Sequence, residues 1–186
     1  MEDGASDLQV FLKVLSFSAE RHRKQRRKGV EGDPYINHPV EVANLLANVA
    51  GVADITTLVA AVLHDTVEDT ETGPEEIEAL FGRPVRLLVE EVTDDKSLPK
   101  LERKRRQVEG APGRSPAAKL IKIADKICNL RDLTQRPPAD WSRDRRSAYF
   151  DWAEAVVAGC RGLNPALEEC FYESLRRGRE VLAGQA

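Results

Sequence analysis

The sequence predicts an all-α fold, arranged as one compact multi-helix domain around a central metal site. Apolar residues recur at helical spacing almost throughout, and no stretch sustains the alternation of apolar and polar residues that is typical of strands. Proline, glycine and N-cap residues divide this pattern into roughly eight or nine helices with short connections. A chain of 186 residues can bury about 70% of the surface that its unfolded form exposes. We therefore expect residues 1–186 to form a single domain.

The first three helices are delimited by clear start and stop signals. The first is predicted from about Asp7 to Arg26 and ends in a loop over residues 29–34, which is rich in glycine and proline. Asn37-His38-Pro39 begins the second helix, because proline suits an early helical position, and Gly51 follows its end. Asp54 is the candidate N-cap of the third helix.

The remaining helices are expected to begin at proline or at a serine or asparagine N-cap. Their predicted starts are Gly73-Pro74, Arg83-Pro84, Ser115-Pro116, Ser142 and Asn164-Pro165. Two stretches are expected to be more mobile than the rest. Residues 94–114 are densely charged and end in Gly110-Ala-Pro-Gly113, and residues 135–140 contain Pro137-Pro138.

Composition excludes several classes of protein. The 28 Lys and Arg residues nearly balance the 31 Asp and Glu residues, so a net charge of −3 favours neither nucleic acid nor a membrane surface as a partner. No apolar run approaches the roughly 20 residues of a membrane span, and the acidic segment Met1–Val10 does not have a signal-peptide core. We expect a cytoplasmic protein. Its three cysteines, Cys128, Cys160 and Cys170, have no Cys-x-x-Cys spacing and are expected to be free thiols.

The segment from His64 to Asp69 is the most informative part of the chain. It places four ionisable residues, His64, Asp65, Glu68 and Asp69, in an apolar context that predicts a buried helix over residues 60–69. On a continuous helix these four side chains would crowd one side. Burying such groups costs several kcal/mol for each uncompensated charge, so a bound cation or matched basic partners must be present. A metal site is the simplest explanation.

Two further residues complete a plausible ligand set. His38 lies where a loop enters a helix, and Asp125 interrupts the apolar run of residues 120–127. Two imidazoles and two carboxylates suit Mn²⁺, Fe²⁺, Co²⁺ or Zn²⁺ better than Ca²⁺ or an iron–sulfur cluster. An octahedral ion with four protein ligands would retain water, and a divalent ion lowers the pKa of that water. Each residue also has a simpler interpretation: His38 could be a helix cap, and Asp125 could pair with Lys122 or Lys126.

These residues belong to longer segments that resemble a known family. The segments are Arg26-Arg27-Lys28, Pro34-Tyr35-Ile36-Asn37-His38-Pro39, Ala61 to Thr70, Val92-Thr93-Asp94-Asp95-Lys96, and Lys122 to Arg131. Together they resemble the HD phosphohydrolase superfamily and, within it, the RelA/SpoT-type alarmone hydrolases. The strongest likeness is to single-domain small alarmone hydrolases related to the metazoan SpoT homologue. It covers essentially the whole chain, with no synthetase domain of the kind that the long enzymes carry.

The resemblance implies a metal centre and a reaction. The metal, usually Mn²⁺ in this family, would be held by His38, His64, Asp65 and Asp125. The pair Glu68 and Asp69 would activate or orient the attacking water, and a carboxylate one turn from a ligand can accept its proton. Which of the two is the base stays open. The implied reaction removes the 3′-diphosphate from guanosine 5′-diphosphate 3′-diphosphate or its pentaphosphate relative, giving pyrophosphate and GDP or GTP.

Basic residues near the first loop could bind the phosphates of such an anionic substrate. Arg27 and Lys28 lie closest to the loop that carries His38, and phosphate contact and a solvated helix face are equal alternatives for them. By resemblance Asn129 contacts the nucleotide, and Arg145 and Tyr149 contact phosphate or ribose. The simpler interpretation of the last two is a surface salt bridge and a core tyrosine. His22 lies among basic residues, so we expect a structural or substrate-adjacent role rather than metal ligation.

Other functions are open or disfavoured. Adenine counterparts of the alarmone and the 2′-phosphate of NADPH are alternative substrates, since no residue fixes the base. A non-catalytic nucleotide sensor is disfavoured because both Glu68 and Asp69 are retained. A nucleic-acid binder is disfavoured by the near-neutral charge and by the absence of aromatic residues among the basic residues 21–28. The expected partner is a small nucleotide. The oligomeric state is not predicted.

Overall fold

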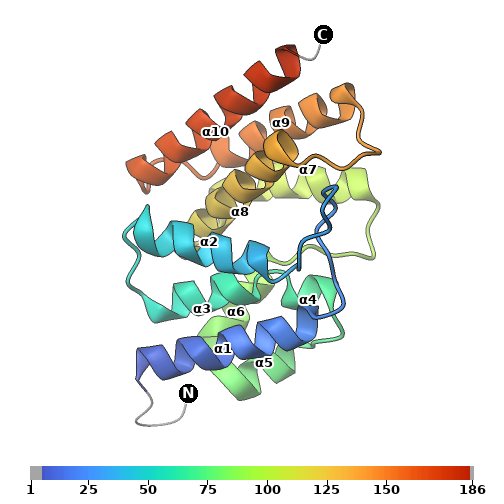
Figure 1. Cartoon of the computed structure of the whole chain (residues 1–186). Helices are drawn as coiled ribbons and strands as arrows, with labels where there is room; N and C mark the ends of the chain where they lie inside the picture. Colours follow the sequence, from blue (N-terminus) through green and yellow to red (C-terminus); the bar gives the residue numbers. More distant parts are fainter. Residues whose placement is uncertain (1–5, 185–186) are drawn as a thin grey trace.

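The computed structural model describes residues 6–184, and its regular secondary structure there is helical, which confirms the all-α prediction (Figure 1). The predicted domain of residues 1–186 and the acidic segment 1–10 extend into residues 1–5 and 185–186, which lie outside the described part. The elements are α1 Asp7–His22, α2 Asn37–Asn48, α3 Ile55–Leu63, α4 Thr66–Asp69, α5 Pro74–Phe81, α6 Arg83–Val92, α7 Lys100–Gly110, η1 (3-10) Ala111–Gly113, α8 Pro116–Gln135, α9 Arg143–Ala158 and α10 Pro165–Ala183.

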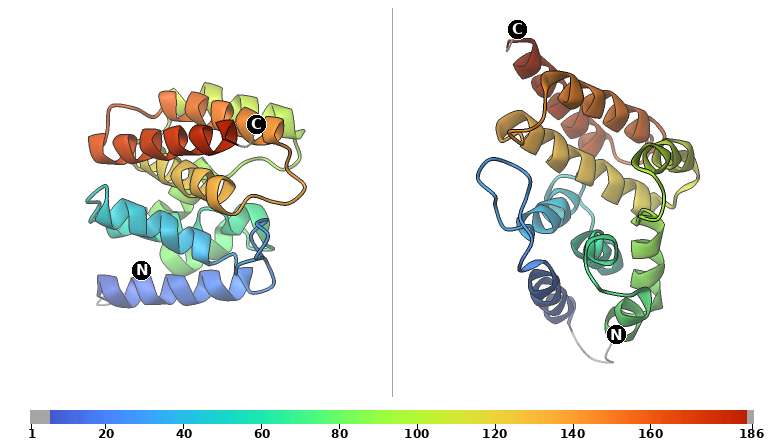
Figure 2. Two further views of the ribbon diagram at one scale, coloured as in Figure 1. Left: turned by 45° about the horizontal axis from the view of Figure 1, so that its top comes forward. Right: turned by 90° about the vertical axis from the view of Figure 1, so that its right-hand side faces the viewer.

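Helix α8 forms the centre of the arrangement. It packs most extensively on α10, and also on α2, α6 and α9. Figure 2 shows α8 between the helices of the N-terminal half on one side and α9 and α10 on the other. Its middle turns, residues 121–128, are buried, as are residues 59–63 of α3. Because core helices are held on several sides, side chains projecting from α3 and α8 have little freedom to move.

The described residues include no helix that is both long and apolar enough to cross a membrane. The three cysteines are free, as expected. Cys128 and Cys160 are buried, and Cys170 is half-buried.

Most helix starts lie where the sequence predicts them. Proline occupies the first turn of α5, α6, α8 and α10. The side chains of Ser115, Ser142 and Asn164 accept hydrogen bonds from backbone N–H groups at the starts of α8, α9 and α10. Gly51 follows α2 with a φ of 67°, a conformation that glycine adopts without strain.

The first helix is shorter than predicted. It ends at His22 rather than at Arg26, because Gln25 N–H bonds to the His22 carbonyl and Arg26 forms an isolated bridge with Pro34. Residues 23–36 therefore form a loop that doubles back on itself. This loop delivers Arg27 and Tyr35 to the same hollow as Asn129 of α8.

The predicted helix over residues 60–69 is interrupted. Helix α3 ends at Leu63, and α4 begins at Thr66. Asp65 between them has φ −101° and ψ −5°, away from the α-helical values near −63° and −42°. The expectation that His64, Asp65, Glu68 and Asp69 crowd one side of a continuous helix is therefore wrong.

The charged stretch 94–114, in which no helix start was predicted, is helical for much of its length. It contains α7 and η1. The helix presents almost no apolar face, since only Gln107 is buried, but Glu102 bonds to Arg105 and Arg106, and Arg105 bonds to Glu109. Ion pairs at these spacings stabilise an exposed helix. The other stretch, residues 135–140, begins at the last residue of α8 and otherwise lies in the connection to α9, residues 136–142.

The N-cap of α3 provides a test of the fold near the site. Asp54 accepts hydrogen bonds from the Thr57 backbone N–H at 2.8 Å and from its hydroxyl at 2.6 Å. We expect Asp54→Ala to lower the free energy of unfolding by about 1 kcal/mol, while Asp54→Asn retains most of it, because asparagine caps as well as aspartate. Urea unfolding of the three proteins measures this. Equal stability of the alanine variant and the parent would contradict it.

The same cap has a defined pH dependence. The hydrogen bond from the Thr57 side chain lowers the pKa of Asp54, so the ionised form is the stabilising one. Its contribution is present above the unfolded-state pKa of about 3.9 and is lost as the pH falls through the lowered pKa of the folded protein.

Candidate active site

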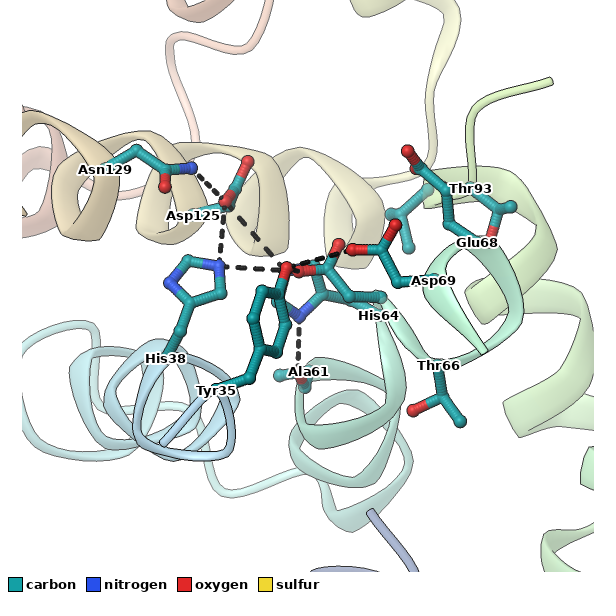
Figure 3. Close-up of polar contacts among 12 residues, drawn as sticks. Tyr35, His38, Ala61, His64, Thr66, Glu68, Asp69, Thr93, Asp125 and Asn129 are labelled. Atoms are coloured by element: carbon teal, nitrogen blue, oxygen red, sulfur yellow. Dashed lines mark hydrogen bonds and ion pairs between the residues drawn. The ribbon is translucent and has the colours of Figure 1, made fainter. Parts of the chain in front are cut away.

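The structure brings the four predicted metal ligands together. His38 lies in the first turn of α2, His64 at the end of α3, Asp65 between α3 and α4, and Asp125 in the middle of α8 (Figure 3). His38 Nε2 is 3.2 Å from Asp125 Oδ1 and 3.6 Å from Asp65 Oδ2. His64 Nε2 is 3.1 Å from Asp65 Oδ2 and 3.9 Å from Asp125 Oδ1.

The orientation of His64 suits a metal ligand. Its Nδ1 donates to the Ala61 carbonyl at 2.8 Å, which leaves the Nε2 lone pair facing the cluster. Among residues 6–184, this buried Nε2 has no hydrogen-bond partner. One donor atom each from His38, His64 and Asp65 lies within 4.8 Å of the others. An unpartnered imidazole nitrogen beside two carboxylates fits a divalent cation.

The protonation states also favour ligation. Burial lowers the pKa of His38 and so favours the neutral imidazole that a metal requires. Burial alone would raise the pKa of Asp65, but the charge of the neighbouring His64 and the contact with its imidazole outweigh burial and lower that pKa. The pKa of Asp125 is likewise lowered. Burial alone would raise it, but the nearby Lys126 ammonium outweighs burial. Both carboxylates are therefore ionised.

The alternative interpretation of Asp125, an ion pair, proves compatible with ligation. Lys126 Nζ lies 2.8 Å from Asp125 Oδ2, while Asp125 Oδ1 faces His38 and accepts from Asn129 Nδ2 at 2.6 Å. Lys122 points elsewhere and donates to the Val92 carbonyl at 2.6 Å. Asp125 thus uses one oxygen for the buried lysine and the other for the cluster.

Glu68 and Asp69 project in different directions from α4 (Figure 3). Glu68 Oε2 accepts from the Asp94 backbone N–H at 3.1 Å, and its Oε1 lies 3.7 Å from Arg103. Asp69 forms an ion pair with Lys96 and contacts the Tyr35 hydroxyl at 3.1 Å. Burial, followed by the charge of Asp65, raises the pKa of Glu68. A carboxylate with a raised pKa beside a candidate metal site has the properties of a general base.

Two predicted substrate residues, Arg27 in the first loop and Asn129 on α8, are linked by hydrogen bonds to the His/Asp cluster. Arg27 Nη2 donates to Asn129 Oδ1 at 2.7 Å, and Asn129 in turn donates to Asp125. Arg27 also contacts Asp132 through Nε at 2.9 Å and through Nη2 at 2.7 Å. Lys28 is exposed. Arg27 is therefore held in place by protein groups, whereas Lys28 is turned to solvent.

Arg145 and Tyr149 lie near each other on α9. The Arg145 guanidinium lies 4.2 Å from the ring centroid of Trp141 and 3.5 Å from Asp140, so the predicted salt bridge is present. Tyr149 is half-buried, and burial raises its pKa to about 12. Both residues also border a hollow at the surface. A salt bridge of Arg145 and partial burial of Tyr149 are therefore compatible with substrate contact.

Two hollows adjoin the cluster and share Lys28, Trp141 and Tyr149. The first, of about 540 Å³, also contains Arg27, Tyr35, Asp69, Lys96, Asn129 and Arg136. The second, of about 340 Å³, contains Lys100, Arg103, Lys104 and Arg145, with Asp94 as its acidic residue. Such a concentration of cations, in a chain of nearly neutral charge, suits a ligand with several phosphates.

Sequence reasoning did not assign roles to several of these residues. Tyr35 lies inside a recognised segment but was not singled out. Arg103 and Lys104 lie on α7, for which the sequence shows no helix start, so their place on one helix was not predicted. Asp132 follows Asn129 by three residues on α8, and that spacing was an available signal. His22 is buried behind Tyr35, outside the cluster, in keeping with a structural role.

The buried His/Asp cluster, the neighbouring carboxylates and the cationic hollows of this all-α domain supply the groups that metal-dependent hydrolysis of a phosphate ester requires. A family model described as HD domain matches residues 15–150. The chain belongs to the HD domain family. A divalent metal is implied by that family and agrees with the donor set found here.

Close relatives have assigned activities. The mouse (Mus musculus) protein guanosine-3′,5′-bis(diphosphate) 3′-pyrophosphohydrolase MESH1 is 58% identical over 166 residues, covering 89% of this chain and 93% of that protein. Its Drosophila melanogaster namesake is 51% identical over 167 residues, covering 90% and 93%. A solved structure, described as a metazoan ortholog of SpoT that hydrolyzes ppGpp and plays a role in starvation responses, matches with a TM-score of 0.88 at 49% identity. The match covers 90% of this chain and 94% of that one.

Proposed function

We propose that this protein is a guanosine-3′,5′-bis(diphosphate) 3′-pyrophosphohydrolase. It removes the 3′-diphosphate from guanosine 5′-diphosphate 3′-diphosphate, or from the pentaphosphate relative, and releases pyrophosphate with GDP or GTP. The observation that carries the proposal is the convergence of His38, His64, Asp65 and Asp125 beside two cation-rich hollows. The activity named for two relatives that are 58% and 51% identical to this chain over the aligned residues supports it.

The proposed ligands are His38, His64, Asp65 and Asp125, and the proposed ion is Mn²⁺. When bound, a divalent ion polarises a phosphoryl oxygen and lowers the pKa of a coordinated water. In the reaction, the oxygen of water forms a bond to the phosphorus next to the ribose, and the bond from that phosphorus to the 3′ oxygen breaks. The 3′ oxygen leaves with a proton, and the water gives up a proton to a base.

The chain's own residues perform the other parts of this reaction. Glu68 or Asp69 accepts the proton from water, since both extend from α4 directly after the metal ligand Asp65. Arg27, Lys28 and Asn129 border the larger hollow, and Arg145 and Tyr149 border the smaller one. We assign these five residues to substrate binding. The positive charges of Arg27, Lys28 and Arg145 offset the phosphate charges, and Arg27 is already oriented by Asp132.

The decisive experiment is a time course of purified protein with Mn²⁺ and guanosine tetraphosphate that resolves nucleotide products and pyrophosphate. We expect GDP and pyrophosphate in equal amounts, and no turnover after chelation of the metal. The adenine counterpart and NADPH, run in parallel, rank the alternative substrates. Turnover of NADPH or the adenine nucleotide alone would replace the guanosine substrate. Bound metal without turnover of any of them would assign the protein to the nucleotide sensors.

A further inference from the structure

The hydroxyl of Tyr35 contacts both the proposed metal ligand Asp65 and the candidate base Asp69. Its hydroxyl donates to Asp65 Oδ2 at 2.7 Å and lies 3.1 Å from Asp69 Oδ2. Asp65 Oδ2 is the oxygen that faces both His38 and His64, so it is the atom of Asp65 best placed to ligate a metal. Figure 3 shows the tyrosine side chain extending from the chain just before α2 toward Asp69.

The ring of Tyr35 is itself held in place. It stacks on His22, with ring centroids 4.9 Å apart and planes inclined by 24°. The Arg27 guanidinium lies 5.5 Å from the same ring. His22 is buried at the end of α1, so the stack ties the tyrosine to a fixed point of the fold.

The loop also holds Asp69 by its backbone. Gln25 Nε2 donates to the Asp69 carbonyl oxygen, and Gln25 Oε1 accepts from His22 Nδ1. The other side-chain partner of Asp69 is Lys96, which is about half exposed. A pair with an exposed lysine orients a carboxylate poorly, because solvent competes for both groups. Tyr35 and Gln25 are therefore the groups that can set the position of Asp69.

We propose that Tyr35 is a positioning residue that fixes the metal ligand Asp65 and the candidate base Asp69 relative to each other through one hydroxyl group. This inference rests on the proposed metal centre and proton acceptors. Partners that hold metal ligands from outside the coordination sphere influence both metal affinity and activity. Tyr35 acts on the ligand through Asp65 and on the chemistry through Asp69, whereas Gln25 contacts Asp69 and His22 but not Asp65.

The test compares Tyr35→Phe, which removes the hydroxyl and keeps the ring stack, with Gln25→Ala. Titration of metal-free protein with Mn²⁺ is expected to show a Kd raised about 10–100-fold for Tyr35→Phe. Its kcat on guanosine tetraphosphate should fall about tenfold, with KM changed less than about threefold, because Arg27 keeps its aromatic neighbour. Gln25→Ala should lower kcat and leave the metal Kd unchanged. Tyr172→Phe, on α10, is the matched control and should resemble the parent.

The outcomes separate a positioning role from a purely structural one. A lower melting temperature of Tyr35→Phe with unchanged metal Kd and kcat would overturn the proposal. The same holds if Gln25→Ala and Tyr35→Phe weaken metal binding equally, because the two contacts would then not be distinct. Metal titration requires no nucleotide, so it decides the role of Tyr35 even if the parent turns over a different phosphoester.

Discussion

Replacing Asp125 with alanine is expected to remove bound metal and activity together. Asp125 contributes the α8 side of the cluster, where its Oδ1 faces His38 at 3.2 Å. Loss of a partner outside the coordination sphere already costs about 10–100-fold in metal affinity, so loss of a ligand must cost more. We expect metal affinity to fall by more than about 100-fold, and turnover to fall to the level of chelated parent protein.

The alanine variant should also be less stable. It leaves the ammonium of Lys126, whose side chain is 4% exposed, without its carboxylate partner. Removing one member of a buried ion pair costs about 3–5 kcal/mol. Asp125→Asn keeps the shape of the side chain and an oxygen that can accept from Lys126, so it should lose less stability than the alanine variant while still lacking the ligand charge. Calorimetric melting and metal analysis of both variants measure this.

Asp144→Ala is the control for Asp125, since Asp144 is an exposed acidic residue in the first turn of α9. It should retain metal and turnover. If Asp125→Asn were folded and bound Mn²⁺ as tightly as the parent, then α8 would not supply a ligand and the proposed centre would be wrong.

Glu68→Gln is expected to keep the metal and lose most of the rate. Glutamine preserves the volume and the acceptor for the Asp94 N–H, but it cannot take a proton from water. Removal of a general base typically costs about 10²–10⁴-fold, so we expect kcat to fall within that range at unchanged metal content. Metal analysis and single-turnover rates on the same preparation provide the measurement.

Asp69→Asn, assayed beside Glu68→Gln, identifies the base. The residue whose amide variant loses more rate at full metal occupancy is the proton acceptor. Glu71→Gln, an exposed change two residues beyond α4, should be silent. Loss of metal in Glu68→Gln, or a full rate in both amide variants, would contradict the assignment of these residues to catalysis.

The helix starts that the sequence predicts best are those at which a side chain caps the helix. Ser115, Ser142 and Asn164 have side chains that bond to free N–H groups, so they mark helix starts whatever the tertiary context. Helix α7 was missed because its sequence has almost no apolar face. Its stability comes from ion pairs such as Glu102–Arg105, which also occur in unstructured charged segments.

The cluster residues could be named from the sequence, but their arrangement could not. The prediction of one helix through residue 69 assumed uninterrupted helical geometry, and the turn at Asp65 depends on contacts from elsewhere. These include the bond from Tyr35, which lies in the loop of residues 23–36 and is 30 residues away from Asp65 in the chain. The partners of Arg27 and Glu68 likewise come from α8 and from residue 94, far away in the chain.

The four-residue helix α4 fixes the number of residues between His64 and Asp69. Asp65 precedes it and Asp69 ends it, while Glu68 faces Asp94. Each residue advances an α-helix by about 100°, so inserting or deleting one residue would turn Glu68 and Asp69 away from their partners while leaving His64 in place. Related sequences should therefore vary in length in the surface loops around residues 29–33 and 135–140, but never between His64 and Asp69.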